Sequence, residues 1–185
     1  MGCALAARLG GSSVTIDDLM TVAKTATTPE SHPGLYLYTG ITHLEYFTTA
    51  SVERLQADAE RQHEAIWPFV RNLIAKHSNW TAAPIVIDGW HLRPHRMAEL
   101  NQDRVEPVWL HIAPDVLEAR ERKNPSWTQN STDPERMFRN FMARSLWYND
   151  LIRREALRFG MHLLHQDGRT SVEALCDAVL ARRPH

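Results

Sequence analysis

Four short apolar runs, rich in β-branched residues, are separated by longer segments with the 3.6-residue period of helices. This alternation restricts the fold strongly, because it is typical of α/β domains. The runs are continuously apolar, which favours parallel strands covered by helices on both faces. The predicted strands are SSVTI (12–16), PIVID (84–88), EPVWLHI (106–112) and MHLLH (161–165).

Three segments between and after these strands predict longer helices. Residues 52–77 place apolar side chains at helical spacing, and Pro68 within them is the expected site of a kink. A second helix is predicted from residue 134 to 159, with Gly160 as its C-terminal cap. The last helix is expected to begin near Thr170.

Length and composition favour one soluble domain. The 185 residues are 43% hydrophobic and 23% charged, with a net charge of −1, which excludes intrinsic disorder and a globally basic nucleic-acid binder. Cys3 and Cys176 are too few for a disulfide framework and favour a reducing compartment. No apolar run approaches the ~20 residues of a membrane span. We therefore expect a cytoplasmic protein.

Acidic residues follow the first two predicted strands. Asp17 and Asp18 come after the first strand, and Asp88 ends the second. Ligands of parallel sheets bind beyond the carboxyl ends of the strands, so these carboxylates are expected to converge on one crevice. There a carboxylate can accept a proton from a substrate hydroxyl or hold Mg²⁺ through water. It can also cap a helix beginning at Leu19, the role favoured for Asp18.

A cationic cluster lies at the end of the helix predicted after the third strand. It consists of Arg120, Arg122 and Lys123. Such a cluster can clamp phosphoryl groups through charge-assisted hydrogen bonds. A solvated face paired with Glu118 and Glu121 is the alternative interpretation. Arg139 and Arg144 on the next helix are supporting candidates for the same anion site.

Residues 32–47 are rich in aromatic side chains and lie between the first strand and the long helix. Tyr36 and Tyr38 belong to this segment, and they could line a substrate pocket. A subdomain that packs its own small core is the alternative. Lys24 lies nearby in the sequence and is a weak candidate for binding an anion.

The segment HLRPH (91–95) follows Asp88 closely. Its two histidines have the spacing of metal ligands on a helix, but Pro94 weakens that geometry and we predict no zinc site. Arg93 in the same segment could reach an anionic substrate.

Four stretches of the chain together resemble a P-loop small-molecule kinase. They are TIDDLMTVAKTATTPESHPGLY, IVIDGWHLRP, PVWLHIAPDVLEARERKN and MHLLHQDGRTSVEAL. The likeness is greatest to the 2-phosphoglycerate kinase-like group, with the zeta-toxin and nucleotide-kinase branches as more distant relatives. The first stretch is the most particular to that group, and the resemblance covers nearly the whole chain.

The resemblance implies an ATP-dependent phosphotransferase that acts on a hydroxyl of a small molecule. Its fold would be a single three-layer α/β domain, with a substrate-binding insertion at about 29–80 and a lid at about 120–135. Nucleic acid and membranes are not expected as partners.

The resemblance also implies a role for individual residues. Asp17 would be the acceptor-side base, and Asp88 a Walker-B-like acid that helps hold Mg²⁺ through water. Arg120 and Arg122 would stabilise the transferring group. The implied acceptor-binding residues are Asp18, Lys24, Arg93, Tyr36 and Tyr38. The implied nucleotide-binding residues are Lys123, Arg139, Asp167, Gly168, Arg169 and Thr170.

The phosphate-binding loop GxxxxGK[ST] of that family is absent from these residues. GCALAARLGG at the start resembles the helix that follows the loop. We therefore expect a chain that lacks the first strand, through a misplaced start or, less favoured, a real truncation. It should be inactive by itself. A binding or regulatory domain that keeps the fold without catalysis is the alternative.

The family's strand order, 2-3-1-4-5, makes the missing strand the central one. Neighbouring strands lie ~4.8 Å apart, so its loss leaves a gap of roughly 10 Å. We expect residues 84–88 and 106–112 either to flank an unfilled slot or to collapse into direct pairing.

Overall fold

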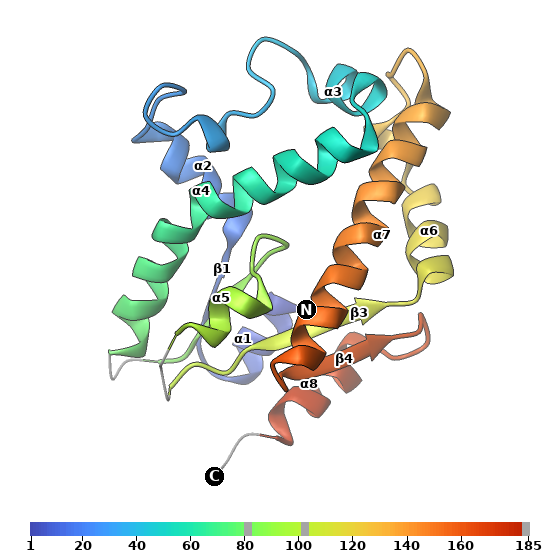
Figure 1. Ribbon diagram of the computed structural model, residues 1–185. Helices are drawn as coiled ribbons and strands as arrows, with labels where there is room; N and C mark the ends of the chain where they lie inside the picture. Colours follow the sequence, from blue (N-terminus) through green and yellow to red (C-terminus); the bar gives the residue numbers. More distant parts are fainter. Residues whose placement is uncertain (80–82, 101–103, 183–185) are drawn as a thin grey trace.

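The computed structural model describes residues 1–79, 83–100 and 104–182. Helices alternate with short strands along these ranges, as Figure 1 shows. In chain order the elements are α1 (Gly2–Arg8), β1 (Ser12–Thr15), α2 (Ile16–Thr25), the 3₁₀ helix η1 (Pro33–Leu35), α3 (His43–Thr49), α4 (Val52–Ser78), β2 (Ile85–Asp88), α5 (Pro94–Ala98), β3 (Val108–Ile112), α6 (Pro114–Arg122), the 3₁₀ helix η2 (Pro125–Trp127), α7 (Pro134–Arg158), β4 (His162–Gln166) and α8 (Val172–Leu180).

The strands form two parallel pairs. β1 pairs with β2, so that Ser12 lies opposite Ile85 and Thr15 opposite Asp88. β3 pairs with β4 from Val108 opposite His162 onward. Each strand agrees with its predicted run to within two residues at either end. The α/β class is therefore confirmed, but the expected sheet is divided: within the described residues the two pairs are not hydrogen-bonded to each other.

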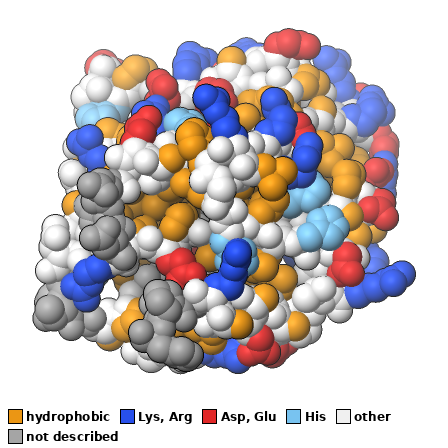
Figure 2. Space-filling model, turned by 60° about the horizontal axis from the view of Figure 1, so that its bottom comes forward, with side chains coloured by type: hydrophobic (Ala, Val, Ile, Leu, Met, Phe, Trp, Pro, Cys, Tyr) orange, Lys and Arg blue, Asp and Glu red, His pale blue; other side chains and the backbone are white. Residues whose placement is uncertain are grey.

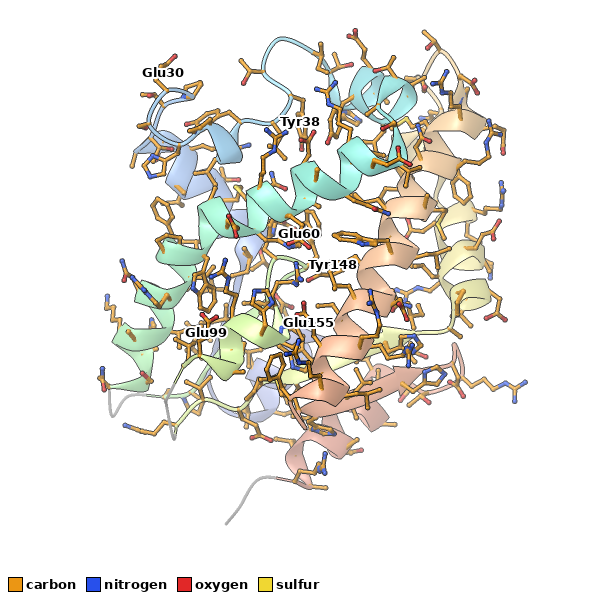
Figure 3. The ribbon with its side chains drawn as sticks, viewed as in Figure 1. Glu30, Tyr38, Glu60, Glu99, Tyr148 and Glu155 are labelled. Carbon is orange, nitrogen blue, oxygen red and sulfur yellow. The ribbon has the colours of Figure 1, made fainter. Side chains whose placement is uncertain are left out.

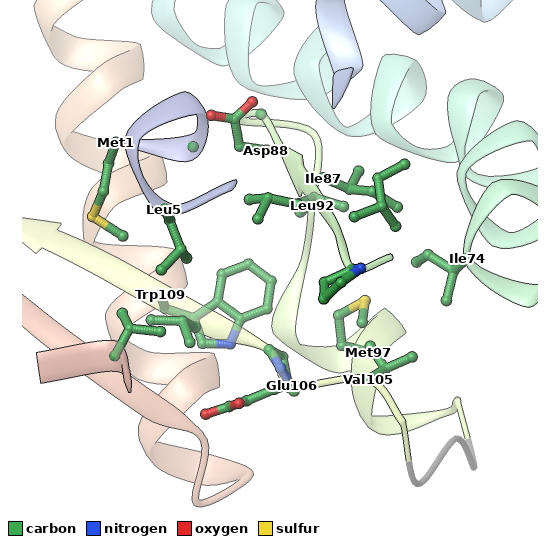
Figure 4. Close-up of a pocket in the computed structure, with 18 of the residues that line it drawn as sticks. Met1, Leu5, Ile74, Ile87, Asp88, Leu92, Met97, Val105, Glu106 and Trp109 are labelled. Atoms are coloured by element: carbon green, nitrogen blue, oxygen red, sulfur yellow. The ribbon is translucent and has the colours of Figure 1, made fainter. Parts of the chain in front are cut away.

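An open cavity of about 760 Å³ separates the two pairs of strands. Residues of β2 and β3 line it, together with the loop at 104–107 before β3. Figure 4 shows Met1, Leu5 from α1 and Ile74 from α4 among the side chains around it. Of the two arrangements expected for residues 84–88 and 106–112, the unfilled slot is the one observed. We call this cavity the slot.

Helices cover both faces of the strands, as the continuous apolarity predicted. On one face α2, α4 and α7 pack around a core that contains Ile16, Ile66 and Val70. On the other face α1 and α8 pack against Val86 of β2 and Val108 of β3. Figure 2 turns the bottom of Figure 1 forward and shows apolar side chains across the middle of that face, among charged ones.

The long helix is continuous through Pro68, and in Figure 1 it changes direction partway along its length. A proline inside a helix removes one backbone hydrogen bond and bends the axis, which agrees with the predicted kink. Gly160 follows α7 with a φ of 64°, the left-handed conformation expected of a C-terminal cap.

Two helix starts differ from the predictions. α2 begins at Ile16 instead of Leu19, with Thr15 as its N-cap: the Thr15 hydroxyl accepts a hydrogen bond from Asp18 N and donates one to Asp18 Oδ2. α8 is capped by Ser171, because the Thr170 hydroxyl is hydrogen-bonded to Asp167 in the preceding turn.

In the described ranges, no helix combines the length and the apolarity that crossing a bilayer requires.

Candidate functional site

A second cavity, of about 270 Å³, lies beyond the carboxyl ends of β1 and β2. α2 follows β1 directly into its wall, and the loop after β2 supplies another part of that wall. The remaining wall comes from the 32–47 segment, α4, η2 and α7. Its lining includes Asp17, Lys24, Tyr38, Gln62, Trp90, His91 and Arg144. We call it the acceptor cavity.

Asp17 lines the acceptor cavity from the first turn of α2. Its carboxylate is exposed and is hydrogen-bonded to no described residue, whereas that of the adjacent Asp18 is bonded to Thr15. Asp18 therefore lies in the first turn of α2 and is not its N-cap, which is Thr15, so the capping role predicted for Asp18 is wrong; its carboxylate accepts a hydrogen bond from the capping hydroxyl instead. Asp17 is left as an unpaired carboxylate at the cavity, available to accept a proton or a hydrogen bond.

Arg144 of α7 lies among aromatic rings at the same cavity. Its guanidinium carbon is 4.7 Å from the centroid of Phe47, 4.8 Å from that of Trp90 and 5.4 Å from that of Phe141. Burial lowers its pKa. No described carboxylate forms an ion pair with it, and none of its N–H groups is hydrogen-bonded within the described ranges.

Lys24 of α2 adds a second cation to the lining. Its ammonium lies 5.6 Å from the centroid of the Tyr36 ring and has no ion-pair partner among the described residues. The acceptor cavity therefore carries two cations and one free carboxylate. This is an arrangement suited to a ligand with an anionic group and a hydroxyl.

Neutral polar groups lie deeper at this cavity. His91 Nε2 is 3.3 Å from Gln62 Oε1, and the rings of His91 and His63 meet edge to face with their centroids 5.3 Å apart. Burial is the main cause that lowers the pKa of His91 to about 4 and that of His63 to about 2. Both imidazoles are therefore uncharged at neutral pH.

Trp90 is held in place by α7. The hydroxyl of Tyr148 donates to the carbonyl groups of Trp90 and Leu92, the latter at 2.8 Å. This contact fixes the loop between β2 and α5, which carries one wall of the acceptor cavity.

Asp88 does not share a cavity with Asp17. Thr15 and Asp88 are opposite each other in the sheet, so the two acids follow the same edge, but Asp88 lines the slot. There it packs against the start of α1, where a Cβ added to Gly2 would lie 2.0 Å from Asp88 Oδ2. Trp90 lines both cavities. The expected single crevice is thus two adjoining ones.

Arg93 is engaged within the protein. Its side chain is 4% exposed and forms ion pairs with Glu60 of α4 at 2.7 Å and Glu155 of α7 at 2.6 Å. Figure 3 shows these two glutamates on facing helices. His95 Nδ1 is also 3.0 Å from Glu155 Oε2. Arg93 therefore joins α4 to α7 and does not line the acceptor cavity, in contrast to its predicted contact with an anionic substrate.

Tyr36 is likewise a structural contact, because its hydroxyl donates to the carbonyl of Thr27 at 2.7 Å and of Lys24 at 3.0 Å. Tyr38 does line the acceptor cavity. Both interpretations of the 32–47 segment hold in part: Tyr46 and Phe47 pack a small core with Leu55, and they also line this cavity.

The predicted lid cations lie away from both cavities. Arg122 pairs with Glu118 at 3.0 Å and Glu135 at 3.5 Å, as the solvated-face alternative expects. Arg120, Lys123 and Arg139 are exposed and line neither cavity.

The predicted nucleotide loop after β4 is a compact turn. Asp167 Oδ1 accepts hydrogen bonds from Arg169 N at 2.8 Å and Thr170 N at 3.0 Å, and these bonds lower the pKa of Asp167 to about 2. Gly168 takes a φ of 80° there. Local turn geometry accounts for these four residues, and they line neither cavity.

Gln62 was not predicted as a lining residue, and Arg144 was predicted only as a supporting candidate for an anion site. Gln62 interrupts the apolar stripe of α4 between Ala59 and Ile66, and a polar residue in such a stripe is a signal of a cavity or a buried network. Arg144 follows Phe141 by three residues on α7, which places both on one helix face. Nothing in the sequence distinguished Arg144 from Arg139.

Within 1–79, 83–100 and 104–182, no three acidic, histidine or cysteine side chains are grouped as metal ligands. The loop GxxxxGK[ST] occurs nowhere in the 185 residues. What the described residues form is a cavity of about 270 Å³ beside two pairs of strands that the slot separates.

Comparisons of the chain with protein-family models, with curated proteins and with solved structures found no significant match. The function is therefore argued from the two cavities.

Proposed function

We propose that these residues are the acceptor-binding part of an ATP-dependent kinase that phosphorylates a hydroxyl of a small molecule. In this proposal the central strand and the phosphate-binding loop come from polypeptide that precedes Met1. The observation that carries the proposal is the slot between β2 and β3, since a parallel strand there would complete the order 2-3-1-4-5 of the P-loop kinases.

The course of α1 supports a strand in that position. Its first residue, Gly2, packs against Asp88 at the carboxyl end of β2. After the helix, Ser12 N donates to the carbonyl of Pro84 at the amino end of β2. α1 therefore runs antiparallel to β2, as a crossover helix does. A segment that reaches Met1 arrives at the carboxyl end of β2, where a parallel strand in the slot would end.

A phosphate loop between that strand and α1 would then lie beside Asp88 and Trp90. Trp90 is shared by the walls of the slot and the acceptor cavity. The loop would supply bound ATP, and the residues described here would act on the acceptor. Arg144 and Lys24 would hold it, while Asp17 would accept the proton of its hydroxyl as the oxygen attacks the γ-phosphorus.

The alternative is a binding or regulatory domain without catalysis. This alternative is favoured because residues of this chain line the acceptor cavity, whereas the phosphate loop is absent from all 185 residues. Both functions predict a ligand in the acceptor cavity. Only the kinase predicts phosphoryl transfer.

The test begins with the genomic sequence upstream of the Met1 codon. The proposal expects an open reading frame that encodes an apolar strand and GxxxxGK[ST]. The extended protein should transfer the γ-phosphoryl group of ATP to members of a panel of hydroxyl compounds. An in-frame stop codon directly upstream would contradict the kinase and leave the binding domain.

Asp17→Asn in the extended protein should lower kcat by about 10²- to 10⁴-fold, because a general base contributes that much to the rate. The KM for ATP should change little, since Asp17 lies on the acceptor side. The matched control is Asp18→Asn, which alters the neighbouring carboxylate at the helix cap and should keep most of kcat. Equal turnover of the Asp17 variant and the unaltered protein would remove Asp17 from the mechanism.

A further inference from the structure

Arg144 carries a charge into the protein without a counter-ion from the described residues. A guanidinium stays protonated in proteins, and transferring it from water is unfavourable unless an anion or several oxygen acceptors compensate. Arg93, the other inward-pointing arginine of this region, has two glutamates for that purpose. Arg144 has neither a carboxylate nor an oxygen acceptor within the described ranges.

The rings around Arg144 do not replace an anion. A cation–π contact contributes less than a buried charge-assisted hydrogen bond, and ring faces accept none of the hydrogen bonds that the five N–H groups of a guanidinium can donate. Rings within 4.7 to 5.4 Å instead restrict the motion of the half-buried guanidinium. A pre-positioned donor of this kind, at the wall of a cavity, is suited to an oxyanion from outside the chain.

Aromatic side chains form much of the remaining wall. They are Tyr38, Tyr46, Phe47, Trp90, Trp127 and Phe141. Such a wall favours a flat apolar body that can lie against ring faces. The volume of about 270 Å³ restricts that body to a small one. Asp17 lines the same cavity and would repel a second anionic group near it.

We infer that the acceptor cavity binds a small aromatic oxyanion, a carboxylate or a phosphate monoester on a single ring, with the oxyanion on Arg144 and the ring against Trp90 and Phe141. That this ligand is the phosphoryl acceptor rests on the proposed function. That the cavity binds such a ligand rests on the cavity alone.

The binding test uses the 185-residue chain at low micromolar concentration, with ligand-observed NMR as the readout. Three probes are compared. Phenyl phosphate carries both the oxyanion and the aromatic ring, inorganic phosphate carries the oxyanion alone, and benzyl alcohol carries the ring without an anionic group. Benzoate replaces phenyl phosphate in a second series and distinguishes the two oxyanions. One aromatic oxyanion should bind at least about 10-fold more tightly than inorganic phosphate and benzyl alcohol.

Arg144→Gln should weaken the binding of the aromatic oxyanion by about 10-fold or more and leave the affinity for benzyl alcohol unchanged. Retained binding of benzyl alcohol shows that the variant is folded. The matched control is Arg139→Gln, an exposed arginine on the same helix that lines neither cavity, and it should bind all probes as the unaltered chain does. Equal losses in the two variants, or equal affinities for the aromatic oxyanion and inorganic phosphate, would overturn the inference.

The extended protein separates this inference from the kinase proposal. Tight binding of an aromatic oxyanion without any phosphoryl transfer would support the cavity assignment and contradict the kinase. Transfer to uncharged hydroxyl compounds that is unaffected by Arg144→Gln would support the kinase and overturn the assignment.

Discussion

Charged and polar side chains in the interior differ in whether the chain itself supplies their partners. Arg93 has two glutamates from two helices, whereas Arg144 has only ring faces within the described residues. His63 and His91 are buried as neutral rings because burial disfavours their charged form. A buried charged side chain with partners from other helices holds those helices together. A charged side chain without such partners at a cavity wall is a candidate for binding a ligand.

Arg93→Gln should lower the free energy of unfolding by about 3 kcal/mol, because it breaks the ion pairs of a buried guanidinium and leaves the half-buried Glu155 without its main partner. Arg96→Gln is the matched control, since Arg96 pairs with the exposed Glu64 at 3.2 Å and should cost at most about 1 kcal/mol. Urea unfolding at pH 7 measures both. Equal, small losses would mean that Arg93 is free to serve a ligand, as the sequence alone predicted.

The buried histidines make stability depend on pH. Their pKa values are lowered to about 2 for His63 and about 4 for His91, so below pH 6.5 the unfolded chain binds protons that the folded chain does not. The free energy of unfolding should therefore fall as the pH is lowered from 7 to 5. Each histidine contributes a slope of up to about 1.4 kcal/mol per pH unit.

His63→Gln should flatten this pH dependence, whereas His43→Gln, at an exposed position on α3, should leave it unchanged. Urea unfolding between pH 5 and pH 7 provides the comparison. If the two variants showed the same slope, the buried imidazole of His63 would not be its source.

Among the helices and strands, the start of α2 contributes both to the stability of the fold and to the position of residues at the acceptor cavity. Thr15 ends β1 and caps α2, whose first turn carries Asp17 and whose later turns carry Lys24. Because the cap determines where the helix begins, it also determines the position of both side chains at the acceptor cavity. Here the sheet edge and the helix start are a single structural unit.

Thr15→Ala should lower the free energy of unfolding by about 1 kcal/mol, because Asp18 N loses its side-chain acceptor. Thr21→Ala is the control within the same helix. The Thr21 hydroxyl bonds only to the carbonyl of Asp17 at 3.0 Å, and its loss should cost less than about 0.5 kcal/mol. Thermal unfolding of the two variants measures the difference, and a larger loss from Thr21 would contradict the assignment of the cap.

For the whole molecule, the slot is the dominant feature. β2 and β3 each have a strand partner on one side and the cavity on the other. Strand edges left in this way carry unpaired backbone groups and are prone to association with other chains. Apolar side chains such as Leu5, Leu92 and Met97 line the same space.

The 185-residue chain should therefore bind ATP negligibly, be poorly soluble and bind the dye ANS through its open apolar surface. Calorimetry with ATP and ANS fluorescence measure these properties. The extended protein should bind ATP and lose most of the ANS signal, because the added strand fills the slot. Micromolar ATP binding by the 185 residues alone would show that no segment is needed.

The sequence by itself determined the order of the elements, because hydrophobic period and turn chemistry are local properties. The strands, the bend at Pro68 and the glycine cap at Gly160 all follow from residues within a few positions of one another. Asp17 was predicted at a cavity because it follows a parallel strand, Tyr38 because its segment is rich in aromatic residues, and Lys24 as a weak anion candidate near that segment; all three line the acceptor cavity.

Only the tertiary structure decided which strands pair, which acids share a cavity and which arginines already have partners. These features depend on side chains far apart in the chain, such as Arg93 with Glu155 and Arg144 with Phe47. An arginine at a given position of a helix can contact a glutamate or line a cavity. The helical period determines which face of the helix carries it, but tertiary packing determines what lies opposite that face. Asp17 and Asp88 follow neighbouring strand ends, but packing places them at different cavities, with Trp90 in the wall of both.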